Sequence, residues 1–434
     1  MRDERCAGRS RSCRYSRSAR GARGLLVRVL VLSQYFAPEP VPIPLEVAES
    51  LMARGHSVRV LTGFPNYPAG ALYEGYRQRR RHREQHGALE ILRIPMIIDH
   101  SQNVLKRMIN YVSFALSALS VRRFSKDADV VYVYATPMTA GIPAWIWWLM
   151  FRVPYVLHVQ DLWPDSVLGS SMVGEGRAAR LIGRVLSPWL RSMYRKAAAV
   201  IGIAPTMVST LIERGSPAVT TTLVYNWAGD AADVVARPVR DGAPVRVVYA
   251  GNVGAMQDLG TAIRAAHAAK DAGVHLEIVG DGVAREDLQA VARDLGAENV
   301  SFHEPVPRDR MPEVYDRTDV ALVSLKDLPV FRGTIPSKFQ GVLAAGLPVL
   351  TTVQGDVRDF VEAHGLGFTA DAEDVAALES SLRAAAASSA EERERMAANA
   401  VRAYQANFAR ESGMDRIETV LVEASRRKGV RNNE

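Results

Sequence analysis

A short run at positions 333–338, GTIPSK, offers the strongest candidate for a binding site in this chain of 434 residues. The pattern predicts Pro336 as the first residue of a helix and Ser337 as its cap. A helix N-terminus presents N–H groups and a partial positive charge, and Lys338 adds a full charge. Together these groups suit a diphosphate. An ordinary capped helix with an exposed lysine would have the same pattern.

Two glycine turns could bring backbone amides close to the same kind of anion. Each follows an apolar run, VRVVYA in one case and HLEIV in the other, and the residues concerned are Gly251, Gly254, Gly280, Asp281 and Gly282. Either turn alone is a weak signal, because tight turns without any ligand use the same residues.

Polar and aromatic side chains gather in the segment 158–165, HVQDLWPD, after the apolar residues YVL. Asp161 and Asp165 could act as general bases or accept hydrogen bonds from sugar hydroxyls. Trp163 could stack on a ligand or simply pack. A histidine inside a strand is more often part of the core than catalytic. For His158 both interpretations, a core residue and a catalytic residue, stay open.

Alternating strands and helices must position these groups. The first series starts with VRVLVLS at 27–33, and a second series starts with VRVVYAGNVG at 245–254. Continuous apolar strands between helices predict an α/β fold with two doubly wound parallel sheets. Ligands bind beyond the carboxyl ends of such strands, so we expect the site in a central cleft between the two sheets.

Composition changes along the chain divide it into five parts. Residues 227–244 are rich in small residues, Asp and Pro and have no period, and the first 24 residues are rich in Arg and Ser. The expected parts are a disordered basic tail at 1–27, an N-terminal domain at 28–226, a linker at 227–244, a C-terminal domain at 245–404, and a C-terminal helix at 405–434 that packs back toward the N-terminal domain.

Charge is distributed unevenly around a net value of +7. Residues 1–220 hold 30 Lys and Arg against 15 Asp and Glu, whereas the remainder holds 24 against 32. The basic half could meet anionic lipid or a phosphate-bearing acceptor, or it could be a solvated basic surface. No RNA-binding domain accompanies the arginine-rich tail, so we expect no nucleic acid partner.

No stretch reaches the roughly 18–20 apolar residues that a membrane span needs. The segment 140–151, AGIPAWIWWLMF, is either a buried crossover helix or a helix in a membrane interface. The only cysteines are Cys6 and Cys13, which gives neither a disulfide framework nor a cysteine metal site. A cytoplasmic protein, with peripheral contact to the inner face of the plasma membrane, fits these features.

Five segments in order resemble glycosyltransferase family 4, and among its members the bacterial enzymes that transfer N-acetylated deoxyhexosamines such as N-acetyl-fucosamine in surface polysaccharide assembly. They are QYFAPEP at 34–40, RGHSVRVLTGFPNYPAGALYEGY at 54–76, HVQDLWPDS at 158–166, YAGNVGAMQDL at 249–259 and IPSKFQGVLAAGLPVL at 335–350. The resemblance implies the GT-B fold, with two Rossmann-like domains. It also implies a UDP-sugar donor, a polyprenyl-diphosphate-linked saccharide acceptor, anomeric retention, and neither metal nor cofactor.

The same resemblance assigns roles to residues. It gives catalytic roles to Asp161, His158 and Lys338, although the family's catalytic-region histidine matches Gln160 if the alignment is made on the following aspartate. It assigns nucleotide-sugar binding to Gly251, Asn252, Gly254, Gln257, Gly280, Asp281, Gly282, Pro336, Ser337, Lys338 and Gly341. It assigns acceptor binding to Pro38, Glu39, Asn66, Trp163 and Asp165.

This sequence departs from the family pattern at several of these positions. Gly333 and Gly341 match a pair of family glutamates, and Asn252 and Gln257 match a family arginine and lysine. Lys338 is therefore the main cation left for the diphosphate. Two other functions stay open: a UDP-sugar 2-epimerase, which shares the fold, and a non-catalytic nucleotide- or glycan-binding protein, which the missing glutamates favour.

Overall fold

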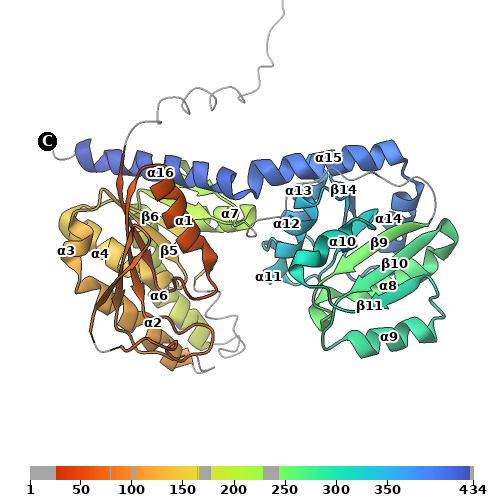
Figure 1. The fold of residues 1–434 in the computed structure, drawn as a ribbon, viewed down its shortest axis with the longest axis horizontal. Helices are drawn as coiled ribbons and strands as arrows, with labels where there is room; N and C mark the ends of the chain where they lie inside the picture. The colour runs from red at the N-terminus through yellow and green to blue at the C-terminus, as the bar shows by residue number, and fades with distance from the viewer. Residues whose placement is uncertain are drawn as a thin grey trace, which may run out of the picture. The chain divides into compact units, whose positions relative to one another are not determined.

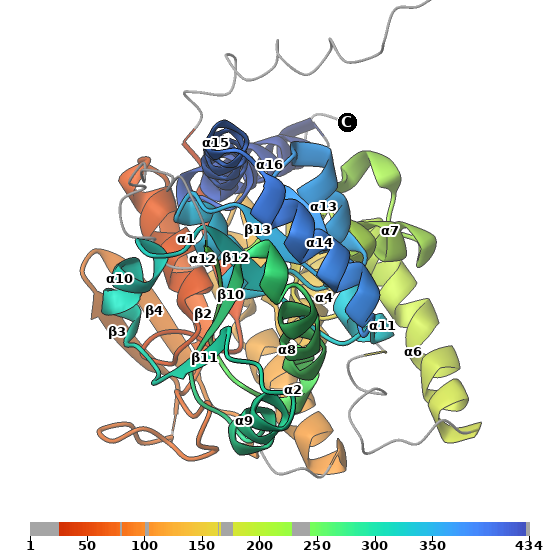
Figure 2. The same cartoon turned by 90° about the vertical axis from the view of Figure 1, so that its right-hand side faces the viewer.

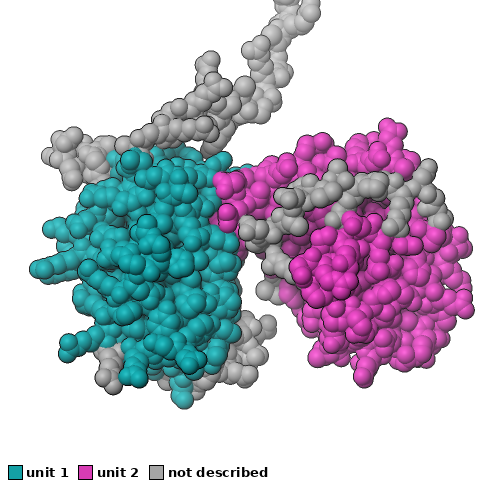
Figure 3. Space-filling view, viewed as in Figure 1, with its two compact units in different colours: residues 1–200, 414–434 teal, residues 201–413 magenta. Residues whose placement is uncertain are grey.

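The computed structural model describes residues 26–78, 80–99, 104–163, 165, 177–227 and 244–430. The chain divides into two compact units, residues 1–200 with 414–434 and residues 201–413 (Figure 3). Almost all of the expected tail at 1–27 and of the expected linker at 227–244 lies outside the described residues.

The first unit contains most of a sheet with the strand order β3-β4-β2-β1-β5-β6-β7-β8 (Figure 1). β3 and β4 pair antiparallel, whereas β1, β2, β4, β5 and β6 pair parallel. The elements are β1 (Arg28–Ser33), α1 (Pro42–Ala53), β2 (Ser57–Gly63), β3 (His82–His86), β4 (Leu89–Ile94), α2 (Val104–Leu119), α3 (Arg122–Lys126), β5 (Val130–Ala135), α4 (Gly141–Phe151), β6 (Tyr155–Val159), α6 (Arg177–Lys196), β7 (Ala199–Gly202) and, at the other end of the chain, α16 (Arg410–Val430).

The central strands of this sheet are buried along their whole length. All six residues of β5, VVYVYA, are buried, as are all five residues of β6. Such strands need cover on both faces, which explains why they read as continuous apolar runs instead of alternating ones. The α/β prediction for this half is confirmed.

The tryptophan-rich segment forms α4, between β5 and β6. Trp147 is 1% exposed and packs in the core, while Trp145 and Trp148 are half-buried. The guanidinium of Arg152 lies 4.4 Å from the centre of the Trp148 ring. Of the two interpretations of this segment, the crossover helix is confirmed. Among the described residues, no helix combines the length and the apolar character needed to cross a bilayer.

The second unit contains a parallel sheet with the order β11-β10-β9-β12-β13-β14. Its elements are α7 (Pro205–Glu213), β8 (Thr221–Leu223), β9 (Val245–Ala250), α8 (Leu259–Ala268), β10 (Val274–Val279), α9 (Arg285–Asp294), β11 (Val300–His303), α10 (Met311–Tyr315), β12 (Val320–Val323), α11 (Pro329–Arg332), α12 (Ser337–Ala344), β13 (Val349–Thr351), α13 (Asp356–His364), β14 (Gly367–Thr369), α14 (Val375–Ala387) and α15 (Ala390–Asn407).

Helices cover both faces of the second sheet. α8 and α14 pack together over one face (Figure 2) and share a core with Val247 of β9. α12, α13 and α15 build the other core, in which the rings of Phe339 and Phe360 meet edge to face, with centres 5.9 Å apart. This doubly wound arrangement places the carboxyl ends of β9 and β10 next to each other, because the two strands are parallel neighbours.

The end of the chain belongs to the first unit. Met414 and Ile417 of α16 are fully buried, and Leu421 is 1% exposed. Near the end of α16, a guanidinium nitrogen of Arg427 donates to the backbone oxygen of Ala198 at 2.8 Å. The last helix therefore completes the core of the unit that the first 200 residues begin.

Candidate functional site

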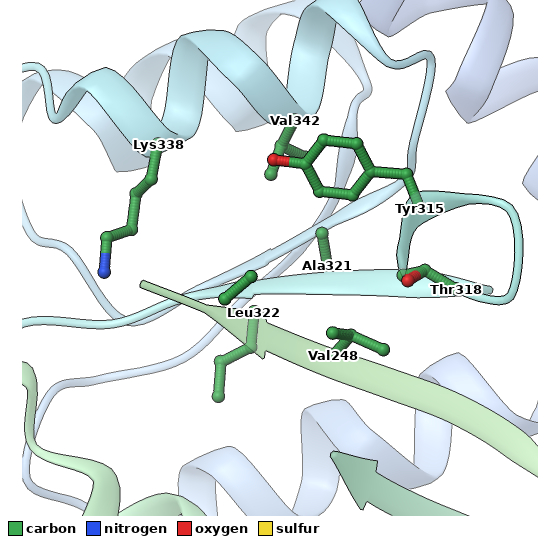
Figure 4. Close-up of a pocket in the computed structure, with 8 residues that line it drawn as sticks. Val248, Tyr315, Thr318, Ala321, Leu322, Lys338 and Val342 are labelled. Carbon is green, nitrogen blue, oxygen red and sulfur yellow. The ribbon is translucent and has the colours of Figure 1, made fainter. Parts of the chain in front are cut away.

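Lys338 lies in the first turn of α12, and its side chain extends toward the carboxyl end of β9 (Figure 4). The helix begins at Ser337, and Pro336 precedes it with extended backbone (ψ 141°). The prediction that Pro336 is the first helical residue and Ser337 the cap was therefore wrong by one position. No side-chain hydrogen bond caps this helix, and the amide of Phe339 donates to the backbone oxygen of Pro336 at 3.0 Å.

The ammonium of Lys338 is held by Tyr249, near the end of β9. Its Nζ donates to the Tyr249 hydroxyl at 2.5 Å and lies 4.0 Å from the ring centre. The hydroxyl donates in turn to the backbone oxygen of Asn252 at 2.6 Å. Burial lowers the pKa of Lys338 to about 8. The lysine is thus a cation with an easily removed proton, fixed beside the first glycine turn.

Beneath Lys338 lies a small cavity, which Figure 4 shows together with its lining. Its volume of about 10 Å³ gives room for roughly one water molecule, so it belongs to the packing under the lysine and is too small for a nucleotide. The lining residues are Val248, Ala250, Tyr315, Thr318, Ala321, Leu322, Lys338 and Val342.

The first glycine turn is closed by its own side chains. Gly251 has a φ of +139°, and a Cβ there would lie 3.3 Å from the Nζ of Lys338. The amide of Gly254 donates to Oε1 of Gln257 at 3.0 Å, and Nδ2 of Asn252 donates to the same oxygen at 3.3 Å. An anion can therefore reach the Gly254 amide only if the Gln257 side chain moves.

The second glycine turn interlocks with the first. A Cβ on Gly280 would lie 2.0 Å from the backbone oxygen of Gly251, and one on Gly282 would lie 2.3 Å from the backbone oxygen of Val253. The amide of Val253 donates to the oxygen of Asp281 at 2.9 Å. Packing of backbone against backbone thus explains both glycines of this turn, and Asp281 is exposed next to them.

Neighbouring side chains face the two positions where the family pattern has glutamates. A Cβ on Gly333 would lie 3.1 Å from Cγ2 of Thr206, whose hydroxyl donates to Asp356 at 2.7 Å. A Cβ on Gly341 would lie 3.5 Å from the hydroxyl of Tyr315. Thr206 therefore restricts the space at position 333, whereas at 341 a hydroxyl lies within van der Waals distance.

His158 lies inside β6 and is fully buried. Its Nδ1 is 2.6 Å from the Tyr132 hydroxyl, and burial lowers its pKa to about 3, so the ring is neutral. A ring closed off from solvent in this way cannot contact a sugar directly. Of the two interpretations, the core histidine is the one that the structure supports, and the catalytic assignment is corrected.

The other candidate residues of the segment 158–165 differ in how far their side chains are exposed. Asp161 is partly exposed, and burial raises the pKa of its carboxyl while the Thr136 hydroxyl acts in the opposite direction. Trp163 is 2% exposed and packs near Tyr111, with ring centres 6.2 Å apart, which corrects its assignment as an acceptor-stacking ring. Asp165 is exposed.

The residues expected to bind the acceptor near 38–66 instead fasten two loops. Glu39 is 4% exposed; its Oε1 accepts from the amides of Asn66 and Tyr67, both at 2.8 Å, and its Oε2 accepts from the amide of Phe36 at 2.9 Å. Asn66 is fully buried and donates to the oxygen of Phe64. Their acceptor-binding role is corrected to a structural one, while Pro38 is exposed.

Sequence reasoning missed Tyr249 and a second aromatic and basic pair. In α2, Nη2 of Arg107 donates to the hydroxyl of Tyr111 at 3.0 Å, and this bond is the main cause of the raised pKa of Arg107. Their spacing of four residues, which brings two side chains together on a helix, was a signal for this pair. Tyr249 gave no such signal, because an aromatic residue in a strand predicts only core packing.

Known families and structures match along most of the chain. The "Glycosyl transferase 4-like domain" family matches residues 41–227, and "Glycosyl transferases group 1" matches residues 235–403. Over 386 residues the chain is 28% identical to WcaI of Escherichia coli strain K12, which its name assigns to colanic acid biosynthesis as a glycosyl transferase; the match covers 83% of this chain and 92% of the relative.

Two solved structures give the fold. Anabaena HepE in complex with UDP has a TM-score of 0.58 at 16% identity, over 91% of this chain and 99% of that one. WaaG, a glycosyltransferase involved in lipopolysaccharide biosynthesis, has a TM-score of 0.55, with the same identity and coverage. Two α/β sheets of mainly parallel strands, the two family matches and these neighbours lead to one conclusion: the chain belongs to the family 4 glycosyltransferases of the GT-B fold.

Proposed function

We propose that the second unit binds the diphosphate of a UDP-sugar at Lys338. The observation that carries this proposal is the position of the ammonium, in the first turn of α12 and beside the turn that follows β9. The partial positive charge at the N-terminus of α12 and the full positive charge of Lys338 lie close together. Both lie beyond the carboxyl ends of parallel strands, where ligands bind in such sheets. The similarity to HepE, which was solved with UDP, supports the choice of nucleotide.

In this proposal the chain transfers a glycosyl group with retention and without a metal ion. The C–O bond between sugar and diphosphate breaks while an acceptor hydroxyl attacks on the same face of the sugar, and the hydroxyl proton passes to an oxygen of the leaving diphosphate. Lys338 stabilises the charge that develops on the leaving diphosphate, and the helix N-terminus contributes its dipole. Asp161, the partly exposed carboxylate of the most specific motif, orients a sugar or acceptor hydroxyl.

We further propose that the product is part of a surface polysaccharide. The names of two relatives support this step, since WcaI is assigned to colanic acid biosynthesis and WaaG takes part in lipopolysaccharide biosynthesis. The proposed donor carries an N-acetylated deoxyhexosamine, and the proposed acceptor is a saccharide on a polyprenyl diphosphate. Both come from the resemblance of five segments of the sequence to one group of family 4 enzymes.

A lipid-linked acceptor would require contact with a membrane, and α2 offers a surface for it. Three apolar side chains on one side of this helix are exposed, Ile109 at 43%, Val112 at 39% and Leu116 at 62%. Ile97, 55% exposed, is fastened to the same helix, because its amide donates to the Ser113 hydroxyl at 2.9 Å.

Basic residues lie at both ends of this apolar strip, with Lys106 near the start of α2 and Arg122 and Arg123 directly after it. All three are exposed or partly exposed. Apolar residues with flanking cations suit the interface of an anionic bilayer better than a neutral partner. We therefore propose that this surface rests peripherally on anionic lipid, on the cytoplasmic side where nucleotide sugars are made available.

Binding of UDP in the presence of EDTA tests the nucleotide site. UDP should raise the melting temperature of the wild type, because a ligand that binds only the folded state stabilises it. In Lys338→Ala, loss of a charge-assisted hydrogen bond of roughly 1.5–3 kcal/mol should weaken UDP binding about 10–150-fold. Lys270→Ala, an exposed lysine of the same unit, is the matched control. A shift that requires magnesium, or one that is undiminished in Lys338→Ala, would contradict the proposal.

Product analysis separates the candidate functions. A transferase releases UDP from a UDP-sugar only when an acceptor is present, and NMR of the product gives the anomeric configuration. An epimerase isomerises the sugar without any acceptor, and a binding protein changes neither molecule. Acceptor-independent isomerisation, or unchanged sugar with a tested panel of lipid-linked saccharides, would count against transfer.

A further inference from the structure

We propose that Tyr249 is the positioning residue for Lys338: its hydroxyl holds the ammonium beside the turn 251–254, so that the cation is already oriented when a diphosphate arrives. The inference rests on the proposed UDP site and adds a residue that acts through Lys338 and not on the ligand. It is carried by the chain of contacts from Lys338 through Tyr249 to the backbone of the turn.

The direction of these hydrogen bonds makes Tyr249 a fixed acceptor. Its O–H donates to the backbone oxygen of Asn252 at 2.6 Å, which leaves the lone pairs of the phenol oxygen for the ammonium of Lys338. The tyrosine is 0% exposed and packs in the core with Val247 and Leu276. A rigid, buried acceptor thus restrains the flexible end of a lysine, a side chain that otherwise has many accessible rotamers.

Gly251 makes this contact possible. A Cβ at this position would lie 3.3 Å from Nζ and 3.6 Å from Cε of Lys338, and 4.0 Å from the Tyr249 hydroxyl. The lysine therefore passes close over a residue without a side chain. Tyr249 and Lys338 are 89 residues apart in the sequence. Together with Gly251 they nevertheless form one cluster at the carboxyl end of β9.

Among the described residues that line the cavity under Lys338, none except the lysine itself carries a charge. The cavity that Lys338 lines contains one other titratable side chain, Tyr315 of α10, and the remaining lining residues are neutral. Tyr249 of β9 is the titratable group in direct contact, and burial raises its pKa, so it remains protonated. Because the phenol oxygen accepts from the charged form of the lysine, it favours the ammonium over the neutral amine, in opposition to burial.

Removal of the hydroxyl should therefore change two measurable properties. Without an acceptor, the Lys338 side chain is less restrained, and UDP affinity at pH 7 should fall several-fold, by about one decade at most for the loss of one hydrogen bond. The pKa of Lys338 should also fall further below its ordinary value. A role in packing alone would alter neither the affinity at fixed temperature nor its pH dependence.

The experiment is calorimetric titration of the full-length protein with UDP in EDTA between pH 6.5 and 9.5, a range that brackets the pKa of about 8 for Lys338. In the wild type, affinity should fall as the pH rises through about 8, because the free protein loses the proton that the diphosphate requires. In Tyr249→Phe the affinity should be lower, and its fall should begin at lower pH. In Lys338→Ala the affinity should be low and lack this pH dependence.

Tyr155→Phe is the matched control. Tyr155 is also a buried tyrosine of a parallel strand, and its hydroxyl donates to a backbone oxygen, that of Met193, at 2.6 Å. This variant should lose stability but retain the wild-type affinity and pH dependence for UDP.

The outcomes are distinguishable. If the wild type binds no UDP at any pH, the nucleotide site itself is wrong, and the role of Tyr249 falls with it. If the wild type binds UDP and Tyr249→Phe has the same affinity and the same pH dependence, only the positioning role is overturned. If Tyr249→Phe does not fold, Gly251→Ala takes its place: its methyl group would lie 3.3 Å from Nζ, so the ammonium must shift by a few tenths of an ångström while Tyr249 stays intact. Unchanged UDP binding in that variant would also overturn the role.

Discussion

Nε2 of His56, in the turn between α1 and β2, lies 3.0 Å from Oε1 of Glu418 on α16. The amide of Val27 donates to Nδ1 of the same ring at 3.2 Å, so the hydrogen of the neutral imidazole must be on Nε2 and points at the carboxylate. Arg54 donates to the other oxygen of Glu418 at 2.6 Å. One carboxylate therefore fastens α16 to the turn that follows α1.

We expect Glu418→Ala to lower the free energy of unfolding of the first unit by about 1–3 kcal/mol, since charge-assisted hydrogen bonds are lost. Asp415→Ala is the control: Asp415 also pairs with Arg54, but its side chain is 74% exposed, and such pairs contribute about 0–1 kcal/mol. Urea unfolding of both variants measures the difference. If both variants lose the same free energy of unfolding, Glu418 contributes no more than an ordinary surface ion pair does.

The same carboxylate should make the first unit sensitive to acid. Burial alone would raise the pKa of Glu418, but the hydrogen bonds from Arg54 and His56 outweigh it and hold the pKa below the ordinary value of 4.5. A carboxyl with a lowered pKa stabilises the fold above its unfolded value and loses this contribution as pH falls through the folded value. Below about pH 4.5 the stabilities of wild type and Glu418→Ala should therefore converge; parallel curves would contradict the assignment.

Gly280→Ala should disrupt the second unit more than a substitution at a glycine whose Cβ would meet no neighbouring atom. Its methyl group would lie 2.0 Å from the backbone oxygen of Gly251, so the two glycine turns must separate. Gly296→Ala is a control for a positive φ without a clash, since nothing lies within 4 Å of its Cβ, and should cost about 1–2 kcal/mol. Thermal unfolding with and without UDP compares them, and we expect the UDP-induced shift to be lost only in Gly280→Ala.

Asp161→Asn should lower turnover about tenfold or more while the fold is retained, because the amide cannot accept protons or hydrogen bonds as a carboxylate does. Asp127→Asn, at an exposed aspartate of the same unit, should keep wild-type turnover. Initial rates at saturating acceptor decide between them. Normal turnover in Asp161→Asn would make this carboxylate structural.

Leu116→Glu should reduce sedimentation with anionic vesicles, since it places a negative charge on the most exposed of the three apolar residues, Ile109, Val112 and Leu116. Val219→Glu makes the same kind of change at a residue that is 94% exposed in the second unit and should have no effect. The attraction between the basic residues and the anionic vesicle surface, ~1 kcal/mol per residue, should also weaken as the salt concentration rises. Absence of binding by the wild type at low ionic strength would exclude this surface as a membrane contact.

Local patterns predicted the fold and the position of Lys338. Continuous apolar strands between helices are a property of short windows of sequence, and both sheets follow from them. Lys338 was found because proline, serine and lysine mark a helix start within four residues, even though the predicted cap was wrong by one position.

Long-range contacts explain what the sequence did not reveal. The sequence assigns Glu39 to binding of the acceptor substrate. In the structure its carboxylate instead accepts hydrogen bonds from the amides of Asn66 and Tyr67, 27 and 28 residues away. His158 loses its catalytic interpretation because Tyr132 meets it inside the sheet. Tyr249 gains its role from a lysine 89 residues later. None of these distances can be read from spacing along the chain.

The burial of α16 in the first unit sets an order for biosynthesis. Met414, Ile417 and Leu421 fill the core of a unit whose other residues leave the ribosome more than 200 positions earlier. During translation the apolar surface of the first unit that α16 covers therefore stays exposed while residues 201–413 are synthesised. A nascent chain stalled before residue 414 should therefore recruit a chaperone through its first unit, and one released after residue 430 should not.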